Sequence, residues 1–94
     1  MIYNTYFRYM SNLDKVKAKL LNLSGAFTFQ ELEYLLGKFK YTEKKTGKTS
    51  GSRKAYINSE TKHILRIYKP HLGNELKRYV KIYIIAELKK QNLI

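Results

Sequence analysis

Residues 44–56, with the sequence KKTGKTSGSRKAY, contain a Gly-Lys-Thr triplet among basic residues, which raises the question of a phosphate-binding loop. A nucleotide-binding P-loop needs a glycine separated from the triplet by four residues, since that glycine directs backbone N–H groups at the phosphates. Thr42 occupies this position, and Gly51 follows the triplet too closely for a helix to begin there. The segment is therefore not a nucleotide-binding P-loop.

The charge of the chain is its strongest functional signal. Its 94 residues include 19 Lys and Arg against 7 Asp and Glu, which gives a net charge of +12 and a pI near 9.9. Most of the excess lies between residues 38 and 81, where tyrosines are interleaved with basic residues. This balance favours a polyanionic partner, and nucleic acid is the default. The alternative is a solvated basic surface that only keeps the protein soluble.

Side chains suited to catalysis are few. The chain has no cysteine, which excludes disulfides, thiolate metal sites and a cysteine nucleophile. Its 2 histidines are His63 and His71. We expect no metal and no cofactor. An imidazole titrates near neutral pH and can serve as a general base or acid. For each histidine the alternative is a structural or idle surface role.

The first ten residues, MIYNTYFRYM, have no clean helical or strand period. We expect a tyrosine-rich leader over 1–10 that is disordered or reflects a misassigned start, because Met10 offers a second start. The leader is too rich in tyrosine for a signal peptide, and no stretch has the apolar length of a membrane helix. The predictions are a cytoplasmic protein and a single domain over 11–94, long enough for one modest core.

Two helices are predicted in the first part of the domain. Ser11 or its neighbour can cap a helix that runs to about Leu23, with leucines and a valine on one face. Thr28 and Glu31 have the spacing of a capping box for a second helix, which Gly37 is expected to end. The apolar side chains of both helices are predicted to be core.

After Gly37 the apolar period changes to two, which is typical of strands. Alternation predicts strands around 39–41, 55–57 and 65–67, joined by the TGKTSGS loop and by a tight turn at NSETK. Asn74 is then expected to cap a last helix that runs to about Gln91. The predicted fold class is α+β, with the order α-α-β-β-β-α and a three-stranded antiparallel meander.

With that order, residues 28–94 resemble the HicA-type toxins of bacterial toxin-antitoxin pairs. The resemblance is carried by short motifs in the family's order: Glu31-Leu32-Glu33-Tyr34-Leu35-Leu36, Phe39-Lys40-Tyr41, Gly51-Ser52-Arg53, Pro70-His71 and Glu75-Leu76-Lys77. It implies a fold similar to double-stranded RNA-binding domains and the activity of a metal-independent endoribonuclease. It also implies a cognate HicB-type antitoxin that covers the RNA-binding face.

One position departs from the family, since Arg53 stands where the family has a histidine that is expected to act in RNA cleavage. An arginine cannot accept the 2′-OH proton, because its pKa lies above about 12. It can hold a phosphate through two parallel N–H donors. The predicted RNA-binding residues, which hold phosphate or stack bases, are Lys48, Ser50, Ser52, Arg53, Lys54, Tyr56, Arg66 and Lys69.

Proton transfer then depends on the histidines. His71 is the favoured general base, between the third strand and the last helix, and His63 is the second catalytic candidate, expected near Glu60 across the turn. The predicted function is a toxin-like endoribonuclease. Two alternatives stay open, a non-catalytic module of the same fold that binds RNA or an antitoxin, and a purely protein-binding domain that uses the leader.

Overall fold

The computed structural model describes residues 11–45, 53–70 and 73–94. Within these ranges the chain forms three helices and a three-stranded antiparallel sheet, so the fold class is α+β as predicted. The elements are α2 (Asn12–Leu21), α3 (Phe29–Lys38), β1 (Tyr41–Glu43), β2 (Arg53–Asn58), β3 (Ile64–Tyr68) and α4 (Arg78–Lys90). The expected leader over 1–10 and most of the TGKTSGS loop lie outside the described residues.

Helix α2 begins where the sequence predicts. The Ser11 hydroxyl accepts a hydrogen bond from the backbone N–H of Asp14 at 3.0 Å, which satisfies one of the free donors of the first turn. The helix ends at Leu21, two residues earlier than expected, because Asn22 leaves the helical conformation. The Asn22 side chain instead accepts hydrogen bonds from the backbone and the hydroxyl of Ser24, a local alternative to the helix.

Helix α3 has the predicted capping box. The Thr28 hydroxyl accepts from the Glu31 N–H at 3.1 Å, and the Glu31 carboxylate accepts from the Thr28 N–H at 2.9 Å. The prediction that Gly37 ends the helix is wrong, since the helix continues to Lys38. The chain turns two residues after the helix, at Lys40, which has a left-handed backbone conformation with φ 68°. This turn moves β1 to Tyr41–Glu43, later than the predicted strand.

The sheet has the order β1-β2-β3, with both pairs antiparallel. The predicted turn after β2 is held by Asn58, a buried residue whose amide oxygen accepts from the N–H groups of Glu60 at 2.8 Å and Thr61 at 3.0 Å. Its amide nitrogen donates to the Phe39 carbonyl at 2.8 Å. One side chain therefore ties the hairpin to the end of α3.

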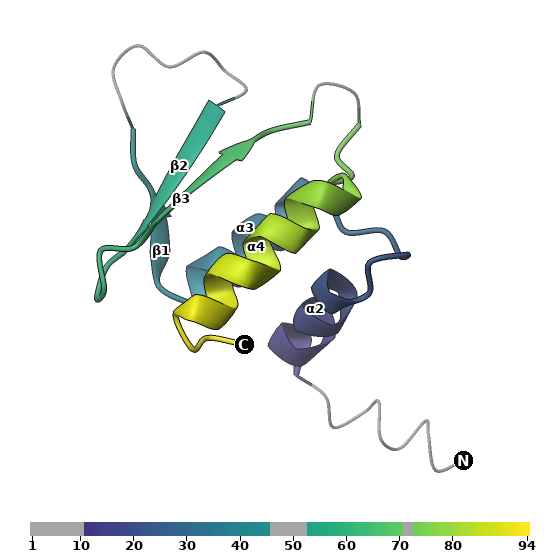
Figure 1. The fold of residues 1–94 in the computed structure, drawn as a ribbon, viewed down its shortest axis with the longest axis horizontal. Helices are drawn as coiled ribbons and strands as arrows, with labels where there is room; N and C mark the ends of the chain where they lie inside the picture. Colours follow the sequence, from purple (N-terminus) through teal and green to yellow (C-terminus); the bar gives the residue numbers. More distant parts are fainter. Residues whose placement is uncertain (1–10, 46–52, 71–72) are drawn as a thin grey trace.

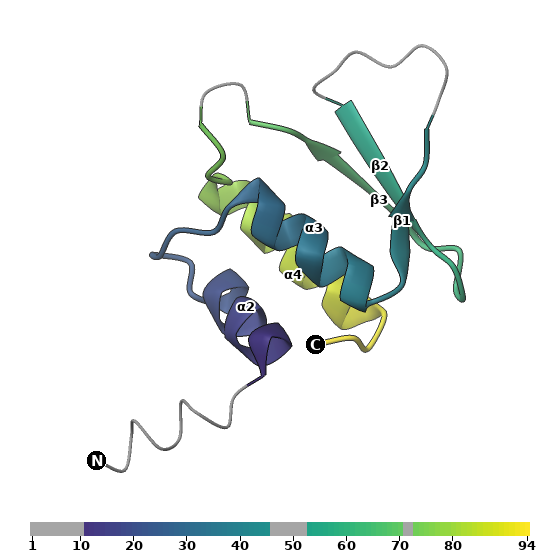
Figure 2. The same ribbon diagram turned by 180° about the vertical axis from the view of Figure 1, so that it is seen from behind.

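Strand alternation divides the sheet into a core face and an open face. Tyr56 pairs with Leu65, and both are buried, as are Tyr41 and Ile67. Arg53 pairs with Tyr68 on the opposite face, because successive side chains of a strand point to opposite sides. Helices α3 and α4 cover the core face, and α2 lies beyond them, farther from the sheet (Figures 1 and 2).

Helix α4 begins later than predicted. Its N-cap is Lys77, which makes no side-chain capping bond, so the expected cap at Asn74 is wrong. The chain before the helix is extended, because the N–H of Leu76 donates to the Phe27 carbonyl at 2.8 Å and the Asn74 carbonyl accepts from Phe29. This pairing occupies the residues that would otherwise form the first turn. The helix ends at Lys90, close to the predicted Gln91.

A buried lysine joins α4 to the end of α2. The side chain of Lys81 is 2% exposed, and its ammonium donates to the carbonyls of Asn22, Leu23 and Gly25 at 3.2, 3.2 and 2.7 Å. A buried ammonium is tolerated only where it is hydrogen-bonded, and here all three of its donors are used. Because carbonyls at a helix C-terminus carry partial negative charge, the contact with Asn22 is also favoured by the dipole of α2.

None of the helices in the described part of the chain has both the length and the apolar character needed to cross a membrane.

Candidate nucleic-acid interface

The open face of the sheet carries a paired arginine and tyrosine at one end. Arg53 and Tyr68 are register partners on β2 and β3. One guanidinium nitrogen of Arg53 donates to the Tyr68 hydroxyl at 3.2 Å, and the guanidinium carbon lies 5.6 Å from the centre of the ring. The ring of Tyr68 remains 62% exposed despite this contact. Arg53 therefore supports a tyrosine that faces solvent.

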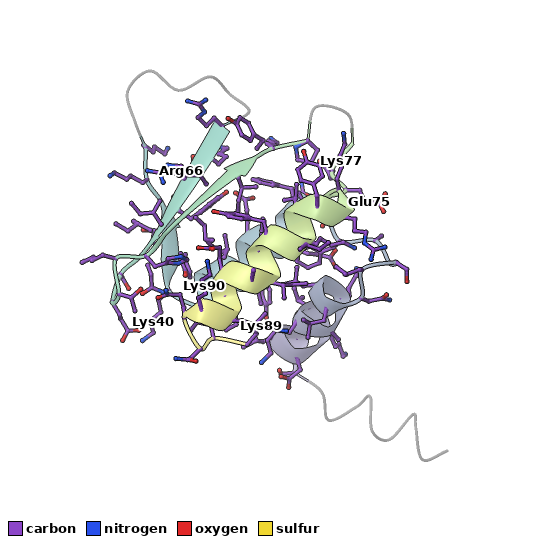
Figure 3. All side chains as sticks on the ribbon, in the orientation of Figure 1. Lys40, Arg66, Glu75, Lys77, Lys89 and Lys90 are labelled. Carbon is purple, nitrogen blue, oxygen red and sulfur yellow. The ribbon has the colours of Figure 1, made fainter. Side chains whose placement is uncertain are left out.

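Arg66 lies on the same face of the sheet. It pairs with Ala55, which is two residues from Arg53 on β2, so both arginines project from the side opposite the core. Figure 3 shows Arg66 directed away from the helices. Its backbone N–H lies at the outer edge of β3, where it donates to the Tyr83 hydroxyl at 3.4 Å.

A hollow runs between the edge of β3 and the first half of α4. Its two adjoining parts, of about 280 and 370 Å³, share Tyr68, Tyr79 and Val80. We call it the tyrosine groove. The remaining lining residues are Lys69, Pro70, Glu75, Leu76 and Lys77 in the first part and Arg66, Ile67 and Tyr83 in the second. Figure 3 shows Lys77 at the start of α4 and Arg66 on the sheet side.

The tyrosines of the groove are exposed, whereas Tyr41 and Tyr56, which also lie in the basic region, are buried. Tyr79 is 69% exposed and Tyr83 is 38% exposed. Tyr56, which was predicted to bind RNA, is 4% exposed and donates its hydroxyl to Glu33 at 3.0 Å. Burial, together with that carboxylate, strongly raises the pKa of Tyr56. Tyr56 is a core residue, and its ring cannot stack on a base in this conformation.

The predicted basic residues differ in their surroundings. The Lys54 ammonium lies 3.2 Å from the Glu43 carboxylate, which offsets its charge. The Lys69 ammonium lies 5.9 Å from the centre of the Phe29 ring and also lines the tyrosine groove. Of these two lysines, Lys69 is the better placed to contact a phosphate.

His63 lies at the opposite end of the sheet from Arg53. Its backbone carbonyl accepts from the N–H of Asn58, the last residue of β2, whereas Arg53 is the first. Five residues of strand separate the two ends by about 16 Å. The structure therefore does not bring His63 and Arg53 into one site.

The His63 ring is held by partners on both sides. Its Nδ1 lies 2.7 Å from the Tyr41 hydroxyl, and its Nε2 lies 2.9 Å from the Glu87 carboxylate. An ionised carboxylate only accepts hydrogen bonds, so Nε2 carries a proton and neutral His63 accepts from Tyr41 through Nδ1. The bond from His63, followed by that from Lys90, lowers the pKa of Glu87. The sequence places Glu60 across the turn from His63, and in the structure the Glu60 carboxylate lies 3.5 Å from the Lys40 ammonium, while the His63 ring contacts Tyr41 and Glu87.

Four other predicted site residues lie outside the described part of the chain. They are His71 as general base and Lys48, Ser50 and Ser52 as phosphate contacts. Their roles stay predictions. Among the described residues, no three His, Asp or Glu side chains gather in the way that a metal site requires.

The sequence interpretation missed the α4 wall of the groove. The sequence places Tyr79 and Tyr83 at helical spacing with the apolar residues of the last helix, yet the fully buried apolar residues of α4 are Ile84 and Leu88. A signal was present, because α4 carries more large apolar side chains than one core stripe needs, and Ile82 is also exposed. Such a surplus indicates a surface with a binding role.

No protein-family model, curated protein or solved structure matches this chain. The functional argument therefore rests on the groove itself.

Proposed function

We propose that this protein is a toxin-like RNA-binding protein that holds RNA in the tyrosine groove. The observation that carries the proposal is the pair of exposed rings on the two walls of the groove, Tyr68 on β3 and Tyr79 on α4. Aromatic rings of this kind stack on bases, whatever the base. A patch of exposed tyrosines needs such a partner to account for it.

Cationic side chains border the rings on both walls. Arg66 lines the groove from β3 and projects from the open face of the sheet, and Lys69 and Lys77 line it near the start of α4. Glu75 is the acidic residue among the lining side chains. Basic residues beside stacking platforms are typical of proteins that bind single-stranded nucleic acid, in which the cations follow the phosphate backbone.

The relation to double-stranded RNA-binding domains is part of the same proposal. It is supported by the order of α3, three antiparallel strands and α4, with both helices on one face of the sheet (Figures 1 and 2). The resemblance of residues 28–94 to HicA-type toxins supports a HicB-type antitoxin as the protein partner. Such an antitoxin would act by covering the groove.

RNA cleavage is the second function, and the resemblance to HicA-type toxins favours it. It requires a group that removes the 2′-OH proton. His63 is unsuited to that role, because Tyr41 and Glu87 occupy both of its ring nitrogens about 16 Å along the strand from Arg53. His71 follows Pro70 of the groove wall in the sequence and is the remaining candidate.

The binding function is tested by fluorescence anisotropy with a labelled single-stranded oligouridylate over a range of salt concentrations. About four phosphate contacts give a slope of log affinity against log salt near −3. Arg66→Ala is expected to weaken binding roughly tenfold and to make the slope shallower by about 0.7, as the loss of one phosphate contact requires.

The matched control is Lys89→Ala. Lys89 is an exposed cation near the C-terminal end of α4, away from Arg66 and Lys77 (Figure 3). This variant removes the same charge from the protein and is expected to bind like the parent. A parent protein that does not bind RNA, or equal losses in Arg66→Ala and Lys89→Ala, would overturn the proposal.

A further inference from the structure

Among the described residues, Arg53 makes its side-chain hydrogen bond with Tyr68. The hydrogen bond to the Tyr68 hydroxyl and the position of the guanidinium beside the ring are both set by the register of β2 and β3. Both residues lie on the open face, and in the described part of the chain the hydrogen bond to the Tyr68 hydroxyl comes from Arg53. Arg53 therefore contacts both the hydroxyl and the ring of Tyr68.

We propose that Arg53 and Tyr68 form one base-stacking platform, in which Arg53 is a positioning residue that orients the Tyr68 ring so that an unpaired base stacks on it inside the tyrosine groove. This inference rests on the proposed RNA-binding function. It replaces the predicted role of Arg53 as a phosphate contact with a role exerted through the tyrosine.

The geometry selects an unpaired base. Tyr68 and Tyr79 line both parts of the groove from opposite walls, so a base that enters between them meets a ring on each side. The bases of a duplex are covered on both faces by their neighbours, whereas those of a single strand are free to stack on aromatic side chains. Single-stranded RNA is therefore the ligand class that uses both rings.

A peptide strand added to the edge of β3 is the competing occupant, and the structure disfavours it. An added strand must pair with the outward N–H groups of β3. The N–H of Arg66 already donates to the Tyr83 hydroxyl at this edge. Native sheets protect free edges by covering them in such ways. A peptide would have to displace Tyr83, while a base entering between Tyr68 and Tyr79 leaves the contact in place.

A double-mutant cycle on binding of the labelled oligouridylate tests whether the pair acts as a unit. Tyr68→Ala is expected to weaken binding roughly 5- to 100-fold, the range for one stacked base. Arg53→Ala should cause a loss of similar size, and the double variant should lose no more than the larger single loss. The matched comparison is Arg66→Ala with Tyr68→Ala, whose losses should multiply, because among the described residues the hydrogen bond and the cation–π contact of Tyr68 are with Arg53 and not with Arg66.

Salt dependence separates positioning from phosphate contact. A residue that holds a phosphate contributes about 0.7 to the slope for single strands. Arg53→Ala is therefore expected to leave the slope of the parent unchanged, unlike Arg66→Ala. Arg53→Lys keeps the charge but lacks the planar guanidinium, so it should bind as weakly as Arg53→Ala. Tyr68→Phe keeps the ring but loses the hydroxyl contact with Arg53, and it should show an intermediate loss.

The outcomes distinguish this inference from the proposed function. If the parent binds RNA but Arg53→Ala makes the slope shallower, Arg53→Lys restores binding and the cycle is additive, Arg53 is a phosphate contact and the platform is wrong. If an RNA duplex binds as tightly as the single strand and Tyr68→Ala has no effect, the unpaired-base preference is wrong while RNA binding stands. If only peptides occupy the groove, or the parent binds no RNA, both proposals fail.

The substituted residues are exposed, so each variant should keep the thermal transition of the parent.

Discussion

The two ends of the sheet use the same kinds of side chain for different purposes. At one end, Tyr41 and His63 face each other and Glu87 closes the set, with every ring nitrogen and the hydroxyl engaged. At the other end, Tyr68 is largely exposed and touches Arg53 through its hydroxyl. The first end is a closed network on the core side, and the second is an open surface of aromatic rings and cations.

The difference shows that residue type does not decide which end is the site. A histidine is the most versatile proton carrier in proteins, yet one whose nitrogens are both hydrogen-bonded inside a structure contributes mainly to stability. A tyrosine with a free face has not used its capacity to stack. We therefore assign stability to the His63 end and binding to the Tyr68 end, and three experiments test this division.

The largest expected effect concerns the two histidines. If the protein cleaves RNA, His71→Ala should reduce the cleavage rate by about 10²- to 10⁴-fold, the usual cost of losing a general base, while RNA binding is largely kept. His63→Ala should cleave at a rate close to that of the parent under conditions where it is folded. The measurement is the rate of degradation of a labelled RNA in the presence of EDTA.

Two results would contradict this assignment. A parent that leaves RNA intact and does not slow growth when expressed alone would reduce the function to binding. A loss of cleavage in His63→Ala that exceeds the loss in His71→Ala would place the chemistry at the closed end.

The second effect is on stability, and here the larger loss is expected from the closed end, where His63 lies, and not from the open end. His63→Ala removes two hydrogen bonds, one from the Tyr41 hydroxyl and one to an oxygen of Glu87, so the free energy of unfolding should fall by about 2 kcal/mol. Tyr68→Ala at the open end should change it by about 0.5 kcal/mol or less. Urea unfolding followed by circular dichroism measures both. Equal losses would show that the ends do not differ in the way we describe.

Local features of the fold were predictable from the sequence, because they depend on residues close in the chain. The Ser11 cap, the Thr28 and Glu31 capping box and the alternation in β2 all involve neighbours within a few positions. The start of α4 was not predictable in this way. It depends on pairing between residues 74–76 and 27–29, which are far apart in the chain.

The same limit applies to the candidate site. Tyr41, Tyr56 and Tyr68 all lie on strands of the basic region, but in the structure the first two are buried and the third is exposed. The partner of His63 lies 24 residues away, on a different element. Sequence patterns identified the basic and aromatic composition of the candidate interface, but strand register and helix packing decide which of those side chains are exposed.

The smallest expected effect is the pH dependence of the closed end. The hydrogen bond from His63 and then that from Lys90 lower the pKa of Glu87 from its ordinary value of 4.5. A carboxylate with a lowered folded-state pKa contributes stability that is fully present above its unfolded-state pKa and is lost as the pH falls through the folded-state pKa. Glu87 therefore adds no slope between about pH 7 and 5, and its contribution declines as the pH falls below 4.5 and is lost once the pH is below the folded-state pKa. Glu87→Gln should be less stable than the parent at neutral pH, and the difference between their free energies of unfolding should narrow on acidification.

Glu31 also titrates in this range. Desolvation raises its pKa, but the bonds from Lys19 and Thr28 outweigh that effect and lower it. Because Glu31 is the same in both proteins, the difference between their unfolding curves isolates Glu87. A gap that stays constant from pH 7 to pH 3 would mean that the carboxylate does not stabilise the closed end through its charge.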